Sequence, residues 1–504
     1  MAALRQIHGS KDHREVAAML SSLAGVYRAQ GRSDESLKLE VESHAMRRRI
    51  YGSSTHTELA ASLCSVSDAF LTQGRLGEAA SLQEESLAMK RKIYGSNDHT
   101  EMARSLCSLG RVYRFQGRLN EAALLEEESL AMRRRIHGSR DHSDVAVALG
   151  SLAQVYQALG RLHESAKLQE ESLAMERRIH GSRDHDDVAA SLCSLAQVYM
   201  AQGRLDDSVS LQEESLAMHQ RIHGSKDHST VATSLCGLAR VYMAHRRSRD
   251  SLSLFEEALA MQRRIHGSKD HREVADTLDS LAQVYKARGQ MDEAAPLFEK
   301  ALAMRQRIHG SKDHYEVADS LYRLAQVYTA RGKLDQAELL FKEALTMRWQ
   351  IHGSKDHYEV ADSLNSLAQV YKARGQMDKA AQLFTKALTM RRQIHGSKDH
   401  YEVADSLDSL AQVYATRGQM DQAAQLFTEA LTMRQRIHAV DGPQCDNPPC
   451  HNQRTQSCSR CKKVGYCSCS CQKQHWKSGH KNECVPKAAA PPAAAAPAAA
   501  ARQS

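Results

Sequence analysis

The chain has 504 residues, of which 42% are hydrophobic, and it contains only two Trp and seven Phe. This length exceeds what one compact core normally serves, so we expect more than one structural unit. The formal net charge is +8. After Asp441 nine basic residues face two acidic ones, which accounts for +7 of that charge. The first 440 residues are therefore almost neutral, which argues against a surface built for nucleic acid.

The start of the chain indicates neither secretion nor membrane insertion. Met1-Ala-Ala-Leu-Arg lacks the apolar core of a signal peptide. No run of eighteen apolar residues exists, so we expect no membrane-spanning helix and no membrane partner.

A short tag, Ile-His-Gly-Ser or Ile-Tyr-Gly-Ser, returns ten times at a constant interval of 43 residues. Its glycines are Gly9, Gly52, Gly95, Gly138, Gly181, Gly224, Gly267, Gly310, Gly353 and Gly396. The copy at residues 437–440 has lost the Gly-Ser and ends the array. A fixed period of this length predicts a solenoid, in which each unit buries its apolar face against its neighbours.

The seventh unit, which starts at Asp270, shows the pattern of all ten. Asp270 followed by Glu273 has the spacing of a capping box, so we expect a first helix to start here. Apolar residues then recur at helical spacing until Gly289. A second helix is predicted from Met291, with acidic residues at its start and Arg307 near its end, as the helix dipole favours. Each unit is therefore predicted to be a helix–turn–helix.

The seventh unit resembles the tetratricopeptide repeat, and the longer unit looks like the variant found in kinesin light chains. The residues at that repeat's signature offsets are Leu278, Leu281, Ala282, Tyr285, Gly289, Ala294, Phe298 and Ala301. These offsets decide against HEAT and armadillo repeats, which the period alone would allow. The resemblance implies an all-α, right-handed superhelical solenoid over residues 1–438 and says little about function.

One turn departs from this pattern. In the sixth unit Arg246 replaces the glycine between the two helices. We expect strain there if the turn needs a left-handed residue, and a joint that bends differently.

Glutamine recurs where first helices of tetratricopeptide arrays face a concave groove. By resemblance, these positions hold Gln154, Gln197, Gln283, Gln326, Gln369 and Gln412, with Arg111 and Arg240 in units three and six. A row of amides can pair with the backbone of an extended peptide. We predict peptide binding at Gln283, Gln326, Gln369 and Gln412; a solvated polar face without a ligand is the competing interpretation.

Two further side-chain types recur with the repeat. Cys64, Cys107, Cys193 and Cys236 share one offset, so they should lie at least one repeat width apart, beyond disulfide reach. We expect them to be half-buried free thiols. Histidine pairs such as His266 and His271 flank the linkers. Their spacing suits a turn better than a metal site, and we favour a capping and packing role.

Eight candidate metal ligands follow the array in four pairs. They are Cys445, Cys450, Cys458, Cys461, Cys467, Cys471, His480 and Cys484. Two tetrahedral zinc sites need eight such ligands, so this segment is predicted to fold around two Zn²⁺ ions. With no ligand position left for water, both sites would be structural and not catalytic.

The segment resembles a MYND zinc finger, through CSRCKKVGYCS, then CQKQHW, then His480-x3-Cys484. The interleaved pairing of that family implies one zinc on Cys445, Cys450, Cys467 and Cys471, and the other on Cys458, Cys461, His480 and Cys484. Such fingers bind short proline-containing peptides, which implies a peptide-binding role for Gln472 and Trp476. Cys469 lies between two predicted ligands and is expected to be a spare thiol.

These features predict four regions: the array at 1–438, a linker at 439–444, the finger at 445–484 and a disordered Ala/Pro tail at 485–504. We expect a zinc-binding adaptor or scaffold for proteins, able to self-associate through uncapped solenoid ends. The alternative is a zinc-finger regulator that contacts nucleic acid or a transcriptional complex. No HExxH, P-loop or GxSxG motif is present, so we expect no enzyme. Free cysteines indicate a reducing compartment, the cytoplasm or the nucleus.

Overall fold

The structure is a computed structural model of the whole chain. It describes residues 12–29, 32–52, 54–95, 97–224, 227–267, 269–309, 314–353, 357–396, 399–440, 456–457 and 465–466. The chain divides into two compact units, Met1–Gln376 and Met377–Ser504. We describe each unit by itself.

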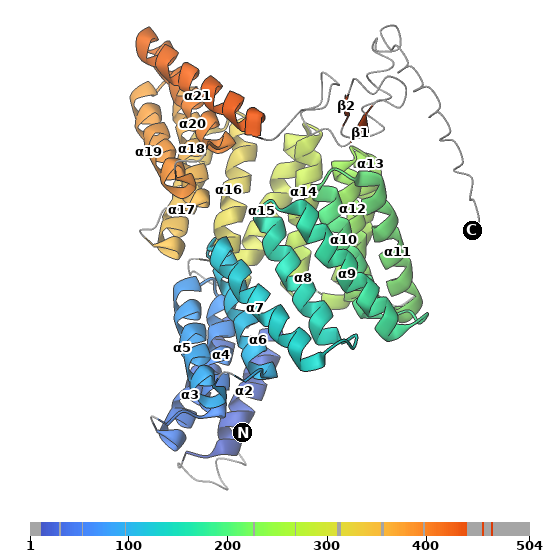
Figure 1. Ribbon diagram of the computed structural model, residues 1–504. Coiled ribbons are helices and arrows are strands. Elements are labelled where there is room, and N and C mark those ends of the chain that lie inside the picture. Colours follow the sequence, from blue (N-terminus) through green and yellow to red (C-terminus); the bar gives the residue numbers. More distant parts are fainter. Residues whose placement is uncertain are drawn as a thin grey trace, which may run out of the picture. The chain divides into compact units, whose positions relative to one another are not determined.

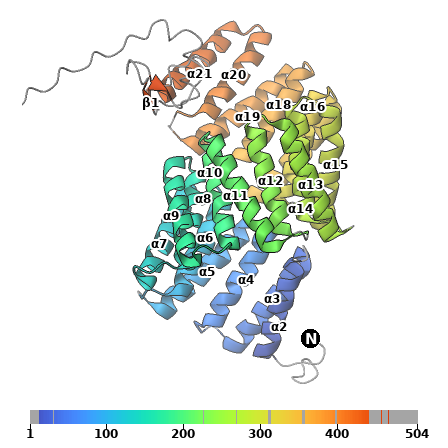
Figure 2. The ribbon, with the colours of Figure 1, turned by 90° about the vertical axis from the view of Figure 1, so that its right-hand side faces the viewer.

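Within the described residues, every repeat is a pair of antiparallel helices, as the sequence predicts. The first helices are α2 (Arg14–Ala29), α4 (Thr57–Thr72), α6 (Thr100–Phe115), α8 (Ser143–Ala158), α10 (Asp186–Ala201), α12 (Ser229–Ala244), α14 (Arg272–Ala287), α16 (Tyr315–Ala330), α18 (Tyr358–Ala373) and α20 (Tyr401–Thr416). The second helices are α3 (Ser33–Tyr51), α5 (Leu76–Tyr94), α7 (Leu119–His137), α9 (Leu162–His180), α11 (Leu205–His223), α13 (Ser248–His266), α15 (Met291–His309), α17 (Leu334–His352), α19 (Met377–His395) and α21 (Met420–Val440). Figures 1 and 2 show the helices of the first unit, α2 to α18, side by side in chain order.

The core runs along the stack because each first helix packs against the second helix of its own repeat and that of the repeat before it. Small and branched side chains fill these contacts: Ala275 and Ala282 are fully buried, and Val274 and Leu278 nearly so. In repeats six to nine a phenylalanine at one offset is also fully or almost fully buried, as at Phe298. The predicted all-α solenoid is confirmed. Among the described residues, no helix is both long and apolar enough to cross a membrane.

The second unit holds α19 to α21 and, in its described part, one short β-ladder. Strand β1 (Gln456–Ser457) pairs antiparallel with β2 (Gly465–Tyr466), with Gln456 opposite Tyr466. Helix α21 continues to Val440, so the helical array extends two residues beyond the predicted end at 438.

The first helices do not start with the predicted capping box. The N-cap of α14 is His271, whose ring accepts a hydrogen bond from the backbone N–H of Glu273. Asp270 instead accepts a fork of hydrogen bonds from Arg307, at 2.6 Å from Nε and 2.8 Å from Nη2. The capping-box prediction was therefore wrong, because the nearby guanidinium takes the aspartate and leaves the cap to the next residue.

The same arrangement returns along the array. The Arg–Asp pairs are Arg49–Asp12, Arg135–Asp98, Arg178–Asp141, Arg221–Asp184, Arg264–Asp227, Arg307–Asp270 and Arg436–Asp399. Each pair ties the end of a second helix to the linker that opens its own repeat. The hydrogen bond from Arg307 lowers the pKa of Asp270. The N-cap histidine stacks face to face on the ring before the linker, for example His271 on His266 with 3.4 Å between ring centroids. The predicted capping and packing role of the histidines is confirmed.

The first unit also closes a contact between repeats that lie far apart in the sequence. His314, at the start of α16, is 3% exposed, and its Nε2 lies 3.0 Å from the backbone oxygen of Thr72 at the end of α4. A Cβ added to Gly74 would meet the ring of Tyr315 at 3.5 Å. One repeat further on, His357 is also buried and its Nε2 faces Gly117, where an added Cβ would lie 3.9 Å away.

Arg246 takes the left-handed conformation, with φ of 60°, that glycine takes at the equivalent turns, for example Gly289 at 77°. Its flanking helices α12 and α13 have the same lengths as those of the neighbouring repeats. The turn therefore requires a left-handed residue, as predicted, but the joint keeps the bounds of the others. A non-glycine residue in this conformation costs about 1–2 kcal/mol.

We predict that Arg246→Gly stabilises the protein by about 1 kcal/mol, because glycine removes this backbone strain. Urea unfolding followed by circular dichroism measures the change. Arg247→Gly is the matched control: Arg247 has a φ of −86° and pairs with Asp250, so its replacement should destabilise. A midpoint unchanged or lowered by Arg246→Gly would contradict the prediction.

We further predict that acid weakens the contact between α4 and the start of α16. Burial and the neighbouring His309 lower the pKa of His314 to about 4. Its Nδ1 already accepts the N–H of Glu316, so a proton added there removes the cap. Because the folded pKa lies below that of an unfolded histidine, the stabilisation is present above about pH 6.5 and is lost as the pH falls toward 4.

At full protonation the loss is about 3 kcal/mol for this ring. Urea midpoints at pH 7 and pH 5 should therefore differ more for the native protein than for His314→Asn, because asparagine can still cap the helix but does not titrate. His142→Asn is the control, since His142 caps α8 with the same Nδ1 bond and its side chain is 42% exposed. Equal pH dependence of the native protein and His314→Asn would refute the assignment.

Candidate binding groove and zinc finger

Side chains from three consecutive first helices line a polar pocket in repeats three to five. The pocket has a volume of about 550 Å³. Its lining residues are Arg114, Gln154, Gln157, Ala158, Gln169, Ser194 and Gln197. Gln154 and Gln197 are two of the positions predicted to face the groove, and the structure brings them together. Helical period explains this, because equivalent positions of stacked first helices face the same side.

The floor of this region is polar, which the sequence analysis missed. Where repeats six to nine bury a phenylalanine, the first five repeats bury a carboxyl or an amide. These residues are Glu40, Gln83, Glu126, Gln169 and Gln212. The signal was present in the sequence as a change at the offset of Phe298, but it was not recognised.

Glu126 shows how this floor differs from an apolar core. Burial raises the pKa of its carboxyl to about 7, against the opposing effect of Arg133 and Arg114. Its Oε2 is buried and makes no hydrogen bond within the described residues. A buried acceptor without a donor is costly, so this part of the groove can accept a hydrogen-bond donor from a ligand or a water molecule.

The predicted amides in later repeats are arranged differently. Gln283 donates to Asp279 on its own helix at 2.8 Å, and Gln326 accepts from Lys286 of the preceding repeat at 2.6 Å. Gln369 is half-buried. Gln412 is exposed and belongs to the second compact unit. Neighbouring side chains therefore hold two of the four amides, and their role in binding stays a prediction.

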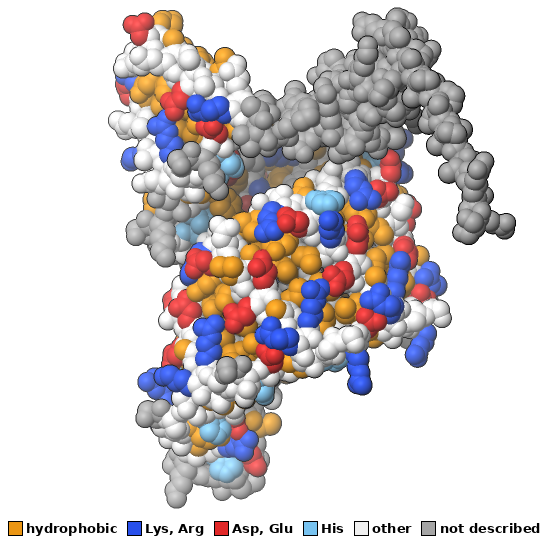
Figure 3. Space-filling view, in the orientation of Figure 1, with side chains coloured by type: hydrophobic (Ala, Val, Ile, Leu, Met, Phe, Trp, Pro, Cys, Tyr) orange, Lys and Arg blue, Asp and Glu red, His pale blue; other side chains and the backbone are white. Residues whose placement is uncertain are grey.

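The arginine of the third unit is also held. Arg111 donates to Asp68 on the preceding first helix at 2.7 Å. Figure 3 shows that on the visible face basic and acidic side chains are interspersed over the described helices, with hydrophobic side chains between them. This mixture agrees with the near-neutral charge of the array.

The four repeat cysteines are free and half-buried, as predicted. Cys64 and Cys193 each lie 3.0 Å from a serine hydroxyl of the following helix, Ser86 and Ser215. Burial raises the pKa of the Cys107 thiol to about 11. Since the thiolate is the reactive form, this thiol is protonated and unreactive at neutral pH.

The eight predicted zinc ligands lie outside the described residues, as do Gln472 and Trp476. The two described strands adjoin this set in the sequence: Ser457 precedes Cys458, and Tyr466 precedes Cys467.

Comparison with known families identifies both parts of the chain. A solenoid of paired helices with Tyr, Gly, Ala and Phe at fixed offsets defines the class of tetratricopeptide proteins. The sequence profile of the tetratricopeptide repeat matches residues 15–92, 144–221, 187–264, 273–348 and 359–436, and a second profile of this repeat matches 102–144. These matches cover more than half of the chain. The chain therefore belongs to the tetratricopeptide-repeat family.

The profile of the MYND finger matches residues 444–484. The C-terminal segment is thus a MYND finger, a zinc-binding module for protein interaction. Ubiquitin carboxyl-terminal hydrolase 16 of Arabidopsis thaliana is 56% identical over 39 residues, which are 8% of this chain and 4% of that protein. The chain spans only this small share of the relative, and the match is confined to the finger, which is a non-catalytic module.

Two solved structures share the repeat. BtubC (BKLC) from P. vanneervenii is 24% identical, with a TM-score of 0.40, over 50% of this chain and 94% of that one. A putative kinesin light chain of Podosopora anserina with nearly identical TPR-like repeats is 29% identical, with a TM-score of 0.35, over 42% of this chain and all of that one. The predicted resemblance to kinesin-light-chain-like repeats and a MYND finger is confirmed.

We predict that a strong zinc chelator unfolds the finger and leaves the array folded, because the array is held by contacts between its own helices and a finger of this size needs its metal. Far-UV circular dichroism should keep its helical signal, while trypsin should cleave within 445–484 only after chelation. Cooperative loss of the helical signal on chelation would contradict this separation.

Proposed function

We propose that this protein is a non-catalytic adaptor that holds two protein partners at once. One partner binds as an extended peptide in the groove of the first helices, and the other binds as a proline-containing peptide on the finger. The finger takes two Zn²⁺ ions through the eight ligands at 445–484. The protein acts in the cytoplasm or the nucleus.

The pocket of repeats three to five is the observation that carries this proposal. Gln154, Gln157 and Gln197 come from adjacent first helices and converge on one cavity of about 550 Å³. Side-chain amides both donate and accept, so they match the alternating N–H and C=O groups of a peptide backbone. Arg114 at the same pocket adds a positive charge for an acidic side chain or a carboxyl end of the ligand.

Self-association is part of the proposal, and the last helix supports it. Phe427 and Leu431 on α21 are 40% and 57% exposed. One repeat earlier, Phe384 and Leu388 are 0% and 4% exposed because the next repeat covers them. A second copy stacking on α21 would bury the same positions.

We predict separate losses for the two binding surfaces. A library of fluorescent peptides, with and without proline, is measured by anisotropy against the full chain. Gln154→Ala combined with Gln197→Ala should weaken groove ligands about tenfold, because each lost hydrogen bond contributes about 0.5–1.5 kcal/mol. Trp476→Ala should weaken only the proline-containing ligands. Gln306→Ala, an exposed amide on the second helix α15, is the control and should change neither.

A single peptide class lost in both variants would refute two independent surfaces. Tight, salt-dependent binding of a nucleic-acid duplex, with no peptide bound, would favour the regulator that contacts nucleic acid. Light scattering on the same samples reports the concentration dependence expected for self-association.

A further inference from the structure

The junction between repeats four and five differs from the others in one buried residue. At this position of the second helix, five other repeats bury a cation. These cations are Lys90, Arg133, Arg305, Arg348 and Arg391. The fourth repeat has Glu176 instead, and this side chain is 4% exposed. A buried carboxylate at a position that elsewhere holds a cation indicates a different local task, since an unpaired buried charge is costly.

Three other ligand-type side chains surround Glu176. His180 at the end of α9 places Nε2 3.2 Å from Glu176 Oε2 and 3.6 Å from Asp187 Oδ2. His185, the N-cap of α10, places Nδ1 3.5 Å from the same Asp187 oxygen. Bonds of 2.0–2.1 Å to a tetrahedral zinc put neighbouring ligand atoms about 3.3 Å apart. The observed separations of 3.2 to 3.6 Å match this arrangement.

Two of these atoms lack a hydrogen-bond partner. Glu176 Oε2 and His180 Nε2 are both buried, and neither makes a hydrogen bond within the described residues. Burial raises the pKa of Glu176, and the nearby charge of Asp187 raises it further. Two carboxylates thus face each other without an arginine or lysine between them in the described structure, and a divalent cation would satisfy both.

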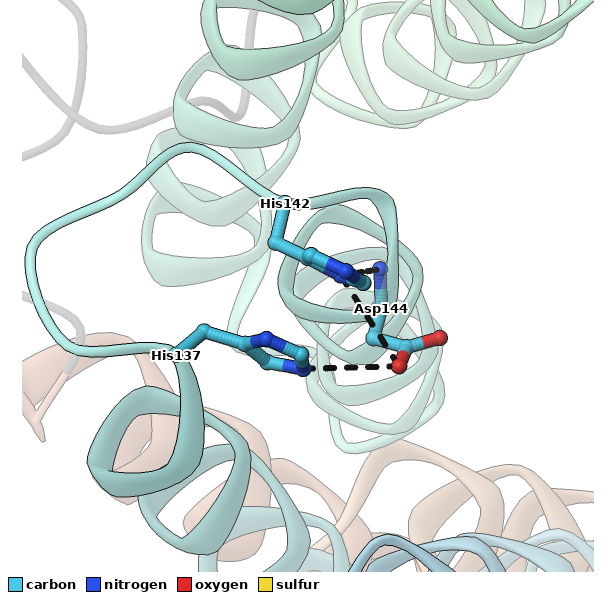
Figure 4. A group of neighbouring side chains, drawn as sticks. All are labelled: His137, His142 and Asp144. Carbon is cyan, nitrogen blue, oxygen red and sulfur yellow. Dashed lines mark hydrogen bonds and ion pairs between the residues drawn. The ribbon is translucent and has the colours of Figure 1, made fainter.

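The preceding junction provides the comparison within the same chain. Figure 4 shows His137 and His142 with their rings face to face beside Asp144. The distances from Asp144 Oδ2 are 3.4 Å to His137 Nε2 and 3.8 Å to His142 Nδ1, close to those at the next junction. Here, however, the buried Arg133 donates to the backbone oxygen of Asp144 at 2.7 Å. Its fixed positive charge opposes a second cation, so the two junctions differ in the group that decides metal binding.

We propose that Glu176, His180, His185 and Asp187 form a metal site for Zn²⁺ or a similar divalent transition ion, separate from the zinc of the finger. The imidazole and carboxylate ligands suit such ions, and the site has no thiolate. It joins the end of α9 to the start of α10, so a bound ion would fix the junction between repeats four and five.

Binding requires one local movement. The rings of His180 and His185 are stacked 12° from parallel with 3.5 Å between centroids. A nitrogen lone pair lies in the plane of its ring, so the His185 ring turns out of the stack to share an ion with His180. In doing so it releases the backbone N–H of Asp187 that it now caps. The ion therefore replaces a cap bond with a bond between the two helices.

The test is a titration of Co²⁺ into the zinc-loaded full chain, followed by visible absorption and by metal analysis after dialysis. We expect one Co²⁺ in addition to the finger metals, without the thiolate charge-transfer bands that a cysteine site gives. Glu176→Arg restores the cation found in the other repeats and should fold normally, as circular dichroism checks. This variant and His180→Gln should each bind the additional Co²⁺ at least tenfold more weakly.

His137→Gln is the matched control at the junction that keeps Arg133, and it should leave the additional Co²⁺ bound. Cys458→Ser disturbs the finger and should also leave it bound. The proposal is overturned if Glu176→Arg or His180→Gln binds as much Co²⁺ as the native chain. It is equally overturned if His137→Gln lowers binding to the same extent, because the histidine pairs would then bind metal without Glu176.

Discussion

The packing of each first helix between two second helices is the constraint on which the array depends. A lone repeat would leave one side of this helix in water, since Val274 and Leu278 are covered from both sides. Burial of a full aliphatic side chain contributes about 1.5–3 kcal/mol, so stacking supplies the stability that a pair of helices lacks. The constant period of 43 residues follows, because a changed length would displace every later contact.

This constraint leaves the linkers to fix orientation. An arginine fork holds the linker aspartate, and a histidine caps the next helix while stacking on the preceding ring. Two residues thus do what one was expected to do. The polar floor of repeats one to five shows the same economy. The stack tolerates Gln169 or Glu126 in place of phenylalanine because neighbouring helices still exclude water from the rest of the contact.

Much of the fold was readable from the sequence. The repeat period, the paired helices, the left-handed turn at Arg246 and the free cysteines were all predicted, because each follows from local spacing or conformation. The cap was assigned to Asp270 instead of His271, because side-chain competition for one aspartate depends on a partner 37 residues away. The zinc ligands at 445–484 remain sequence predictions, supported by the family match.

The sequence alone determined that this is a tetratricopeptide array followed by a MYND finger, since both are encoded in residue types at fixed intervals. Only the tertiary structure decided which repeated residues act together. It places His314 against Thr72, 242 residues apart, and gathers Gln154 and Gln197 at one pocket. It also brings Glu176 beside His180 and Asp187. Such contacts depend on how far each repeat rotates relative to the last, and that rotation is set by packing and not by period.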